Sequence, residues 1–406
     1  MIRTASTFLC LSLLTALSLG CSSSGEAGPN GNGSAGSPNG GASPNGGAPA
    51  AGISGGGAGN GTPMAGANAG GTAGTSAGGA STAGASAAGA ASGGATSSAG
   101  AAGSGGTSTP TTRVIGYLPN WYGSYASWVP KVDFSKLTHI NLAFALGDAN
   151  GNLQLAPDAD IDTFVTAGHA KGVKVFPSLC GGGGDGKIAP FYEPNLVDSF
   201  VDKIIGYVTA RKLDGIDVDV EAPQRMGAKY DTFIAKLKAK AAPLGLPVTA
   251  AVAQWMQSGM SDTTLRSFDF VNIMSYDATG TWTDAGDHSS YQQALDDIAY
   301  YTKKGVAKDR IVLGAPMYGY CWGDCGNGKT KLYVLYKDIL AKHPDAANAD
   351  WIDSNGTKYS YNGTATMAKK TALAAQYGGL MLWELGGDVT SSNADSLLLA
   401  ISKTPH

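Results

Sequence analysis

Residues 213–221 read Leu-Asp-Gly-Ile-Asp-Val-Asp-Val-Glu, a stretch in which acids alternate with aliphatic residues. A period of two is typical of a β-strand, and it places Asp217, Asp219 and Glu221 on one face and the aliphatic side chains on the other. A solvated edge strand has no need of that aliphatic face, so we expect the strand to be buried. Like charges this close in a low dielectric force at least one acid to hold its proton at neutral pH. The acidic face therefore predicts a functional site, whereas Asp214 is out of phase with it and is expected to be structural.

The chain around this strand alternates between strand-like and helical patterns. Residues 113–406 are long enough for one domain with a large core. Apolar, strand-like runs lie at residues 113–118, 139–145, 173–179, 215–221, 247–253, 270–276, 311–317 and 379–385. Amphipathic runs lie between them, for example at residues 196–211, 230–241, 291–304 and 367–376. About eight such units predict an α/β fold, a closed (β/α)8 TIM barrel, and residues able to perform chemistry follow so many strands that the barrel is favoured over a doubly wound open sheet.

The first 112 residues predict export and a tether. Residues 1–20 have a cationic start and an apolar stretch that is too short to span a bilayer as a mature helix, which is typical of a signal peptide. Residues 17–21 resemble a lipobox, although Ser18 departs from its aliphatic preference, and they predict a lipid anchor on Cys21 at the bacterial cell envelope or surface, with plain secretion as the alternative. Residues 21–112 consist mainly of Gly, Ala, Ser, Thr, Pro and Asn, and they predict a disordered, low-complexity linker.

Composition and spacing argue against several partners. The formal net charge of −3 does not suit a nucleic-acid partner, which requires a basic surface. The 5 histidines are scattered without ligand-like spacing, so we expect no metal site. We also expect that the protein needs no cofactor and is a monomer. Residues 181–187 resemble the first part of a phosphate-binding loop, but Ile188 stands where a Ser or Thr is needed to bind magnesium. We therefore expect this glycine-rich segment to be a flexible loop at the barrel mouth.

The cysteines of the predicted barrel suggest an oxidising compartment. Cys321 and Cys325 are placed to close a small disulfide loop after the seventh strand. Cys180 is then left over, and we expect it to be buried and inert.

Residues 214–221 fit the pattern Asp-Gly-x-Asp-x-Asp-x-Glu, which resembles the signature of glycoside hydrolase family 18, the chitinases and their relatives. At the third strand, Cys180 replaces the first glycine of the family's Ser-x-Gly-Gly element. Other segments that resemble the family's strands are residues 114–121, 137–144, 274–277, 314–319 and 379–384. The similarity covers residues 113–400 and implies hydrolysis of an N-acetylglucosamine polymer on a TIM barrel.

The resemblance also implies roles for the acidic row. Glu221 is expected to be the general acid and later the base, with its proton affinity raised by Asp217 and Asp219. An ordinary retaining glycosidase needs a second carboxylate about 5 Å away as nucleophile, and no residue obviously supplies it. In family 18 the 2-acetamido carbonyl of the substrate attacks the anomeric carbon instead and forms an oxazolinium ion. Asp219 is then expected to hold the acetamido N–H and to share a proton with Asp217.

Further residues are expected to contact or support the sugar. Tyr276 is expected to hydrogen-bond the acetamido oxygen. The substrate-binding set also contains Asp277, Trp383, Tyr117, Ser178 and Met274, with Trp383 as the apolar floor of the site and Tyr117 and Ser178 as supports of the acidic row. Plainer interpretations are that Trp383 and Tyr117 only pack in the core and that Asp277 caps a loop. Four tryptophans after strand ends are expected either to line outer sugar subsites or to pack: Trp121, Trp255, Trp282 and Trp322.

Three functions are compatible with these residues. The leading hypothesis is a retaining glycosidase that hydrolyses β-1,4-linked N-acetylglucosamine polymers, chitin or chitooligosaccharides. The alternatives are an endo-β-N-acetylglucosaminidase acting on N-glycan cores and a catalytically silent, glycan-binding chitinase-like protein. Residues 318–377, between the seventh and eighth strands, are expected to be too short for both a helix and the family's full inserted domain, which predicts a shallow groove and endo-acting cleavage.

Overall fold

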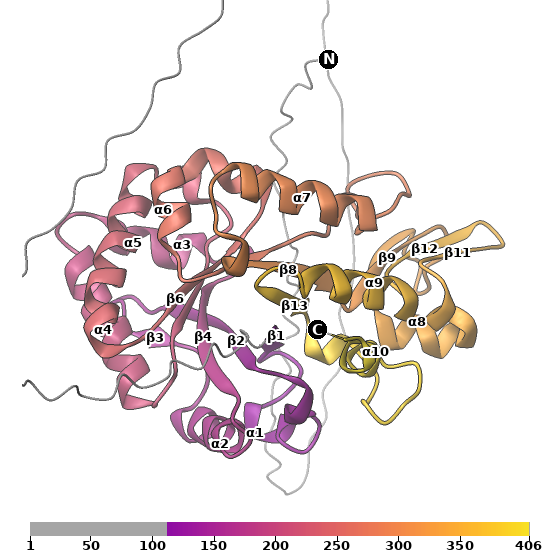
Figure 1. The fold of residues 1–406 in the computed structure, drawn as a ribbon, viewed down its shortest axis with the longest axis horizontal. Helices are drawn as coiled ribbons and strands as arrows, with labels where there is room; N and C mark the ends of the chain where they lie inside the picture. The colour runs from indigo at the N-terminus through magenta and orange to yellow at the C-terminus, as the bar shows by residue number, and fades with distance from the viewer. Residues whose placement is uncertain (1–111, 406) are drawn as a thin grey trace, which may run out of the picture. The chain divides into compact units, whose positions relative to one another are not determined.

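Eight parallel strands close into a barrel in the computed structural model, which describes residues 112–405 (Figure 1). The strands are β1 (Arg113–Pro119), β2 (His139–Gly147), β4 (Lys174–Cys180), β5 (Ile216–Asp219), β6 (Val248–Val252), β7 (Val271–Ile273), β8 (Ile311–Pro316) and β13 (Gly379–Trp383). Their order is β1-β13-β8-β7-β6-β5-β4-β2, and β1 pairs with β2 to close the ring. The TIM barrel is thus confirmed and the open sheet is excluded. The predicted signal peptide, the Cys21 lipidation site and nearly all of the predicted linker lie outside the described residues.

Of the helices in the described residues, most cover the outside of the barrel (Figure 1). The helices are α1 (Tyr125–Trp128), α2 (Asp158–His169), α3 (Asp185–Ile188), α4 (Val197–Ala210), α5 (Ala228–Ala241), α6 (Asp262–Ser267), α7 (Tyr291–Lys303), α8 (Tyr336–Lys342), α9 (Thr364–Ala374) and α10 (Leu397–Lys403). Helix α4 shows why the amphipathic runs fold this way, because its apolar residues recur every three or four positions and are buried: Val197, Phe200, Val201, Ile204 and Val208. All four amphipathic runs predicted from the sequence form helices, at α4, α5, α7 and α9.

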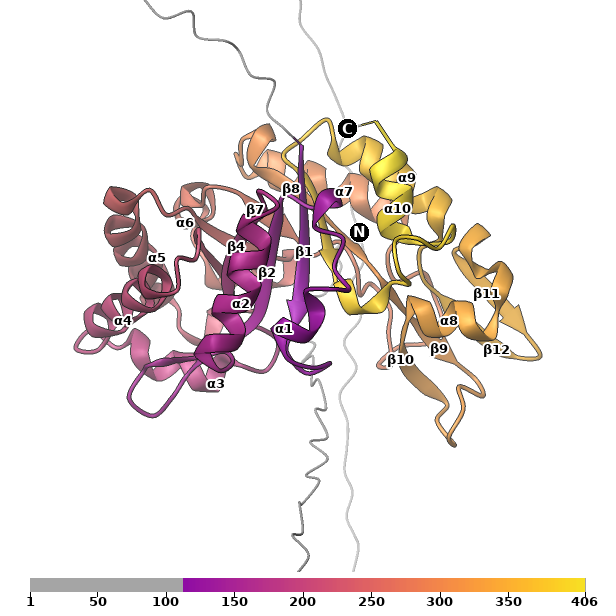
Figure 2. The ribbon, with the colours of Figure 1, turned by 90° about the horizontal axis from the view of Figure 1, so that it is seen from below.

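A second, smaller sheet is inserted between β8 and β13. Its strands are β9 (Tyr318–Trp322), β10 (Lys331–Leu335), β11 (Trp351–Ser354) and β12 (Thr357–Ser360), which pair antiparallel in the order β10-β9-β12-β11. Helix α8 follows β10 and lies beside this sheet (Figure 2). Residues 318–377 therefore hold helices together with a small inserted sheet, and the expectation of a shallow groove without the family's full inserted domain stays a prediction. The strands have only four or five residues each, so a compact sheet fits where a larger one would not.

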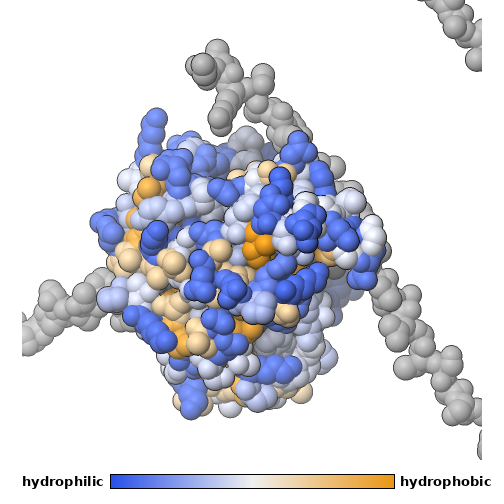
Figure 3. All heavy atoms as spheres, turned by 90° about the vertical axis from the view of Figure 1, so that its right-hand side faces the viewer, coloured by the Kyte–Doolittle hydropathy of each residue, from blue (hydrophilic) through white to orange (hydrophobic). Residues whose placement is uncertain are grey.

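Two apolar cores hold these layers together. The larger lies between the strands and the surrounding helices, and the smaller lies inside the barrel and under the inserted sheet, where it includes Ile115, Phe176, Val312 and Met381. Hydrophilic side chains are spread over the face that carries the inserted sheet, with small apolar patches between them (Figure 3). Among residues 112–405, no helix is both long and apolar enough to cross a membrane.

A short strand, β3 (Leu153–Gln154), pairs antiparallel with the end of β2 and extends the sheet at the barrel mouth.

Asp214, expected to be structural, forms its hydrogen bonds away from the acidic face. Its carboxylate accepts the backbone N–H of Val175 at 2.8 Å and lies 2.7 Å from Nε2 of His169. This side chain therefore ties the start of β5 to β4 and α2.

Candidate active site

Asp217 is the buried anchor of the acidic row. Its Oδ2 accepts hydrogen bonds from the Tyr117 hydroxyl at 2.6 Å and the Ser178 hydroxyl at 2.7 Å, and its Oδ1 accepts from Thr249 Oγ1 at 2.7 Å and Asn272 Nδ2 at 3.2 Å. These donors come from β1, β4, β6 and β7, so one carboxylate joins four strands of the barrel. Burial raises the pKa of Asp217, and the four hydrogen bonds oppose that rise.

Tyr117 and Ser178 thus support the acidic row through Asp217, while their place in substrate binding stays a prediction. Thr249 and Asn272 were missed, although both occupy the inward phase of predicted strands. The predicted sharing of a proton with Asp219 is not seen, because no hydrogen bond joins the two carboxyl groups in the described part of the chain.

Asp219 has a different environment on the same strand face. It is buried, and its Oδ1 has no hydrogen-bond partner among the described residues. Its pKa lies well above the ordinary value because of burial first, and then because of the charges of Glu221, Asp217 and Asp185. A buried carboxyl without donors holds its proton, so Asp219 is the acid with free bonding capacity.

Glu221 lies just beyond the end of β5 and is half-buried. Its carboxyl group packs against the glycine-rich loop, where a Cβ atom on Gly182 would come within 3.1 Å of Oε1. Burial raises its pKa to about 7, with further contributions from the charges of Asp277 and Asp185. We expected Asp217 and Asp219 to supply this charge effect, and that assignment needs correction: the charges that raise the pKa of Glu221 are those of Asp277 and Asp185, while its mutual repulsion with Asp219 raises the pKa of Asp219, which holds its proton.

The glycine-rich loop belongs to the acidic site. It leads into α3, whose first residue, Asp185, is buried and accepts the backbone N–H of Ala222 at 3.3 Å. The thiol of Cys180 lies 3.7 Å from Oδ1 of the same aspartate. Cys180 is buried, as predicted, and burial together with the nearby carboxyl groups raises the pKa of the thiol strongly. The unexpected member is Asp185, which no pattern in the sequence singled out.

Tyr276 and Asp277 follow β7 and face the acids. Tyr276 is buried, and its pKa is raised by burial first and then by the charges of Asp219, Asp277 and Glu221, so its hydroxyl stays protonated.

Asp277 has a φ of 64°, in the left-handed region that aspartate tolerates better than most residues. Its Oδ1 accepts hydrogen bonds from the Tyr318 hydroxyl and, at 3.0 Å, from the Tyr320 hydroxyl. The inserted sheet therefore fixes Asp277, and these contacts replace the loop cap that was the plainer interpretation.

Trp383 lies at the end of β13 in an aromatic group at the barrel mouth. Its ring stacks on Phe144 with centroids 5.6 Å apart and planes at 17°, and it also contacts Tyr117 at 5.5 Å and Trp121 at 6.3 Å. Trp383 is partly exposed, so it is not simply a core residue. Met274, by contrast, is buried in the inner apolar core.

The four remaining tryptophans separate into two groups. Trp121, Trp255 and Trp282 are 47%, 50% and 40% exposed and are available to a ligand. Trp322 is buried, and its Nε1 donates to the carbonyl oxygens of Gly280 and Thr283 at 3.2 Å each. Trp322 is therefore a packing residue that holds the loop after β7.

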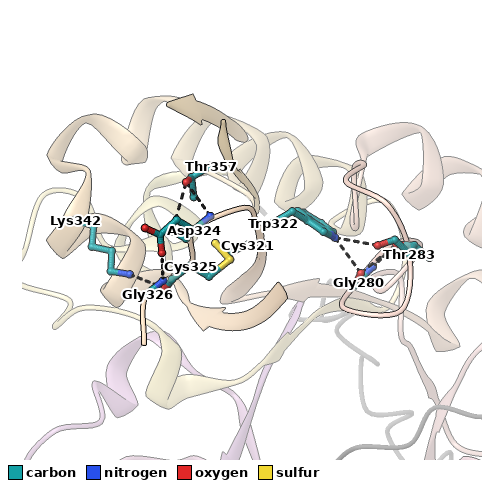
Figure 4. The surroundings of a disulfide bond; sticks show 9 residues. All are labelled: Gly280, Thr283, Cys321, Trp322, Asp324, Cys325, Gly326, Lys342 and Thr357. Atoms are coloured by element: carbon teal, nitrogen blue, oxygen red, sulfur yellow. Dashed lines mark hydrogen bonds between the residues drawn. A yellow bond between two sulfur atoms is a disulfide. The ribbon is translucent and has the colours of Figure 1, made fainter. Parts of the chain in front are cut away.

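The predicted disulfide is present next to Trp322 (Figure 4). Cys321 and Cys325 are joined across a turn at the end of β9, and Asp324 within this turn bonds to Thr357 of β12. In residues 112–405, no group of three or more His, Cys, Asp or Glu side chains is placed to hold a metal ion.

A closed parallel barrel with acids at the carboxyl end of a strand has the architecture of a TIM-barrel enzyme. The family model for glycosyl hydrolases family 18 matches residues 113–388, and the chain belongs to that family. It is 28% identical over 279 residues to a chitinase-like effector of Moniliophthora perniciosa, an alignment that covers 59% of this chain and 62% of the relative. It is 28% identical over 242 residues to a probable endochitinase of Caenorhabditis elegans, which covers 47% of this chain and 39% of the relative. The chain thus spans less than two thirds of the length of these relatives.

Solved structures extend the comparison to the whole barrel. A family 18 chitinase from the chitin utilization locus of Flavobacterium johnsoniae superposes with a TM-score of 0.65 and 30% identity, over 72% of this chain and 93% of the other. A chitinase from Bacteroides thetaiotaomicron superposes with a TM-score of 0.63 and 29% identity, over 72% of this chain and 96% of the other. These likenesses support a glycosidase of the chitinase type.

Proposed function

We propose that this protein is a retaining glycosidase that hydrolyses β-1,4-linked N-acetylglucosamine polymers, with the acetamido group of the substrate as nucleophile. The observation that carries the proposal is the position of Glu221, just beyond the end of β5 and against the glycine-rich loop at the barrel mouth. This side chain reaches the barrel mouth, and burial raises its pKa to about 7, so it is protonated over much of the range near neutral pH. A general acid works best when its pKa lies near the operating pH.

In the first step Glu221 transfers its proton to the bridging glycosidic oxygen, and the bond from that oxygen to the anomeric carbon breaks. The acetamido carbonyl oxygen of the bound sugar attacks the same carbon and closes an oxazolinium ring. In the second step water attacks the anomeric carbon from the vacated face, and the bond from that carbon to the oxazolinium oxygen breaks, which restores the acetamido group. The Glu221 carboxylate takes a proton from the attacking water. Two inversions at one carbon give retention, and the acid is restored.

Two other groups are suited to the acetamido group. The free Oδ1 of Asp219 is an acceptor for the amide N–H, whose acidity grows as the ring closes. The protonated hydroxyl of Tyr276 is a donor for the amide oxygen. The exposed part of Trp383 offers an apolar surface for the C–H face of the sugar, as is usual for aromatic side chains in such sites.

Two alternative functions can be tested with the same purified protein. An endo-β-N-acetylglucosaminidase would share the acidic row and cut the core of N-glycans. A silent glycan-binding protein would share the barrel, and a chitinase-like effector is among the relatives. The presence of Glu221 with a raised pKa favours an enzyme over the silent protein.

The decisive experiment is a product analysis on the purified chain. We expect soluble oligomers from chitin tetramer to hexamer, release of the β-anomer in proton NMR, and no cleavage of high-mannose glycopeptides. Cleavage confined to glycopeptides would establish the N-glycan alternative. Release of the α-anomer, or binding without turnover of either substrate, would overturn the proposal.

We also propose that the protein is exported and carries a lipid on Cys21, on the basis of residues 1–21, and that it acts as a monomer. Labelling of cells with a tagged fatty acid should mark the wild-type protein and leave Cys21→Ala unlabelled. Equal labelling of both proteins, or of neither, would contradict the lipid anchor.

A further inference from the structure

A buried lysine outside the acidic row lies behind the loop that carries Tyr276 and Asp277. Lys370 belongs to α9, and its side chain is fully buried. Its Nζ donates hydrogen bonds to the carbonyl oxygen of Ser289 at 2.8 Å, to the hydroxyl of the same serine at 2.7 Å, and to Oδ1 of Asn362 at 2.8 Å. No carboxylate of the described residues lies within 4.0 Å of this nitrogen. Burying a charged amine without a counter-ion costs free energy, and the hydrogen bonds of Lys370 must offset that cost.

The surrounding hydrogen bonds match the ammonium form of Lys370. The Ser289 hydroxyl donates its one hydrogen to the backbone carbonyl of Ser275 at 2.7 Å, so it can only accept from Nζ. The Asn362 amide nitrogen donates to the carbonyl oxygens of Ser289 and Tyr361, at 2.9 and 3.1 Å, so its Oδ1 faces the lysine. Three acceptors need three hydrogens, which only the charged form of lysine carries.

These bonds end at the backbone of the candidate active site. Ser275 immediately precedes Tyr276, and its own hydroxyl donates to Asp297 of α7 at 2.7 Å. The loop that follows is closed at its base by a bond of 3.0 Å from the Ala278 N–H to the His288 carbonyl. Lys370 therefore bonds directly to Ser289, at the base of residues 278–288, which include the exposed Trp282. Through the Ser289 hydroxyl it is also linked to Ser275, just after β7.

We propose that Lys370 is a positioning residue: its ammonium, acting through Ser289, fixes the Ser275–Tyr276 peptide and the base of the 278–288 loop, and so sets the place of the Tyr276 hydroxyl. The effect on catalysis rests on the proposed function, whereas the effect on the loop does not.

Charge on Lys370 makes the arrangement dependent on pH. Burial lowers the pKa of Lys370 to about 7, against the opposing charges of Asp350 and Asp297. Besides Asp350 and Asp297, His288 is a titratable group close to Lys370. Burial lowers the pKa of His288, so this side chain is neutral near pH 7. The ammonium is present below a pH of about 7 and is lost as the pH rises through that value, together with one of its three hydrogen bonds.

The test compares Lys370→Met and Lys370→Arg with Lys369→Met, which removes an exposed lysine from the neighbouring position of the same helix. Hydrogen exchange of residues 275–289 reports on the loop without any substrate. We expect faster exchange in Lys370→Met and unchanged exchange in Lys369→Met. With chitin oligomers, we expect kcat of Lys370→Met to fall roughly tenfold to a hundredfold, because small displacements of substrate-positioning groups have effects of that size.

The pH profile separates positioning from simple loss of stability. In the wild type two groups with pKa values near 7, Glu221 and Lys370, should make the alkaline limb of kcat steeper than a single deprotonation allows. Lys370→Arg keeps its charge across this range, so its limb should follow Glu221 alone and should be shallower. Identical slopes in the two proteins would overturn a role for the ammonium.

Ser289→Ala keeps the test decisive if Lys370→Met fails to fold. This variant removes the hydroxyl between Nζ and Ser275 and retains the carbonyl that Lys370 also binds. We expect a lower kcat and faster exchange at residues 275–278. Wild-type exchange at residues 275–278 in Ser289→Ala, with wild-type kcat, would overturn the inference. A wild-type chain that hydrolyses none of the substrates would overturn the proposed function, and the exchange comparison would still decide the role of Lys370.

Discussion

Asp217 and Asp219 lie two residues apart on the same buried face of β5, but only Asp217 is surrounded by hydrogen-bond donors. Four side chains from β1, β4, β6 and β7 bond to Asp217, whereas Oδ1 of Asp219 has no partner among the described residues. The first acid therefore stabilises the barrel interior, and the second keeps its bonding capacity for a ligand. Glu221 continues the acidic row to the barrel mouth, where its partly exposed side chain can be reached by a bulky substrate.

The anchoring role of Asp217 predicts a loss of stability in Asp217→Asn. The new amide group places hydrogens where one carboxylate oxygen accepted two hydrogen bonds, so buried donors lose an acceptor. Leaving such groups unpaired costs about 1–3 kcal/mol, and the free energy of unfolding in urea should fall by that amount. Asp353→Asn, on the exposed strand β11, is the matched control and should unfold like the wild type. Equal midpoints for all three proteins would contradict the anchoring role.

Removal of the proposed acid should stop hydrolysis without changing the fold. Glutamine has the shape of glutamic acid but cannot give up a proton, so kcat of Glu221→Gln on chitin oligomers should fall by about 10²–10⁴. Circular dichroism and the melting temperature should remain close to those of the wild type, because Glu221 forms none of the contacts that hold Asp217.

The exposed Glu193 provides the control for this substitution. Glu193→Gln breaks only a surface ion pair with Lys229, so its activity should equal that of the wild type. Turnover by Glu221→Gln at the wild-type rate would remove the acid role from this residue.

The barrel was predictable because each strand is a short apolar run bounded by polar residues. The limits of β5 and β7 differ from the expected ones for a physical reason. β5 ends at Asp219 and β7 ends at Ile273, so Glu221 and Met274 follow the strands, at the mouth where the chain turns away to build the site. The inserted sheet was missed because its strands are short, and polar residues interrupt the alternation that a sequence pattern depends on, as in the Thr357–Ser360 strand.

The candidate site was predictable along β5 and less so across the barrel. Periodicity alone placed Asp217, Asp219 and Glu221 on one face, since it depends only on neighbours in sequence. The charges that raise the pKa of Glu221 come from residues on loops, whose positions the sequence pattern does not give. One of them, Asp185, reaches the site from a glycine-rich segment without periodicity. No pattern of spacing could have found that contact.

Glu384 should contribute a loss of stability as the pH rises through the neutral range. This side chain is buried after Trp383, its Oε2 accepts the Gly386 N–H at 2.6 Å, and its Oε1 has no partner among the described residues. Burial raises its pKa from 4.5 to about 7. Between these values the folded chain holds a proton that the unfolded chain has released, so the free energy of unfolding falls with increasing pH and the loss is complete above a pH of about 7.

Glu384→Gln should therefore flatten this pH dependence. Glutamine stays neutral, so melting temperatures measured from about pH 5 to about pH 8 should decline less in the variant than in the wild type. A residual slope should remain, because the pKa of Glu221 is also raised to about 7 and that of Asp219 is raised as well. Glu193→Gln again serves as the control and should keep the wild-type slope. A variant slope equal to that of the wild type would show that Glu384 is ionised in the folded protein across the range.

The disulfide between Cys321 and Cys325 should stabilise the inserted sheet and the loop that it holds. The bridge closes a loop with a sequence separation of 4, for which chain entropy gives a stabilisation of about 2 kcal/mol. Within that loop, Trp322 donates to the carbonyl oxygens of Gly280 and Thr283, so a looser turn should also loosen the segment around Trp282. A Cys321→Ser/Cys325→Ser double variant should lose roughly 2 kcal/mol in urea unfolding. Reductant should lower the wild-type midpoint to the same value and leave the double variant unchanged, whereas a wild-type midpoint that does not respond to reductant would contradict a stabilising bridge.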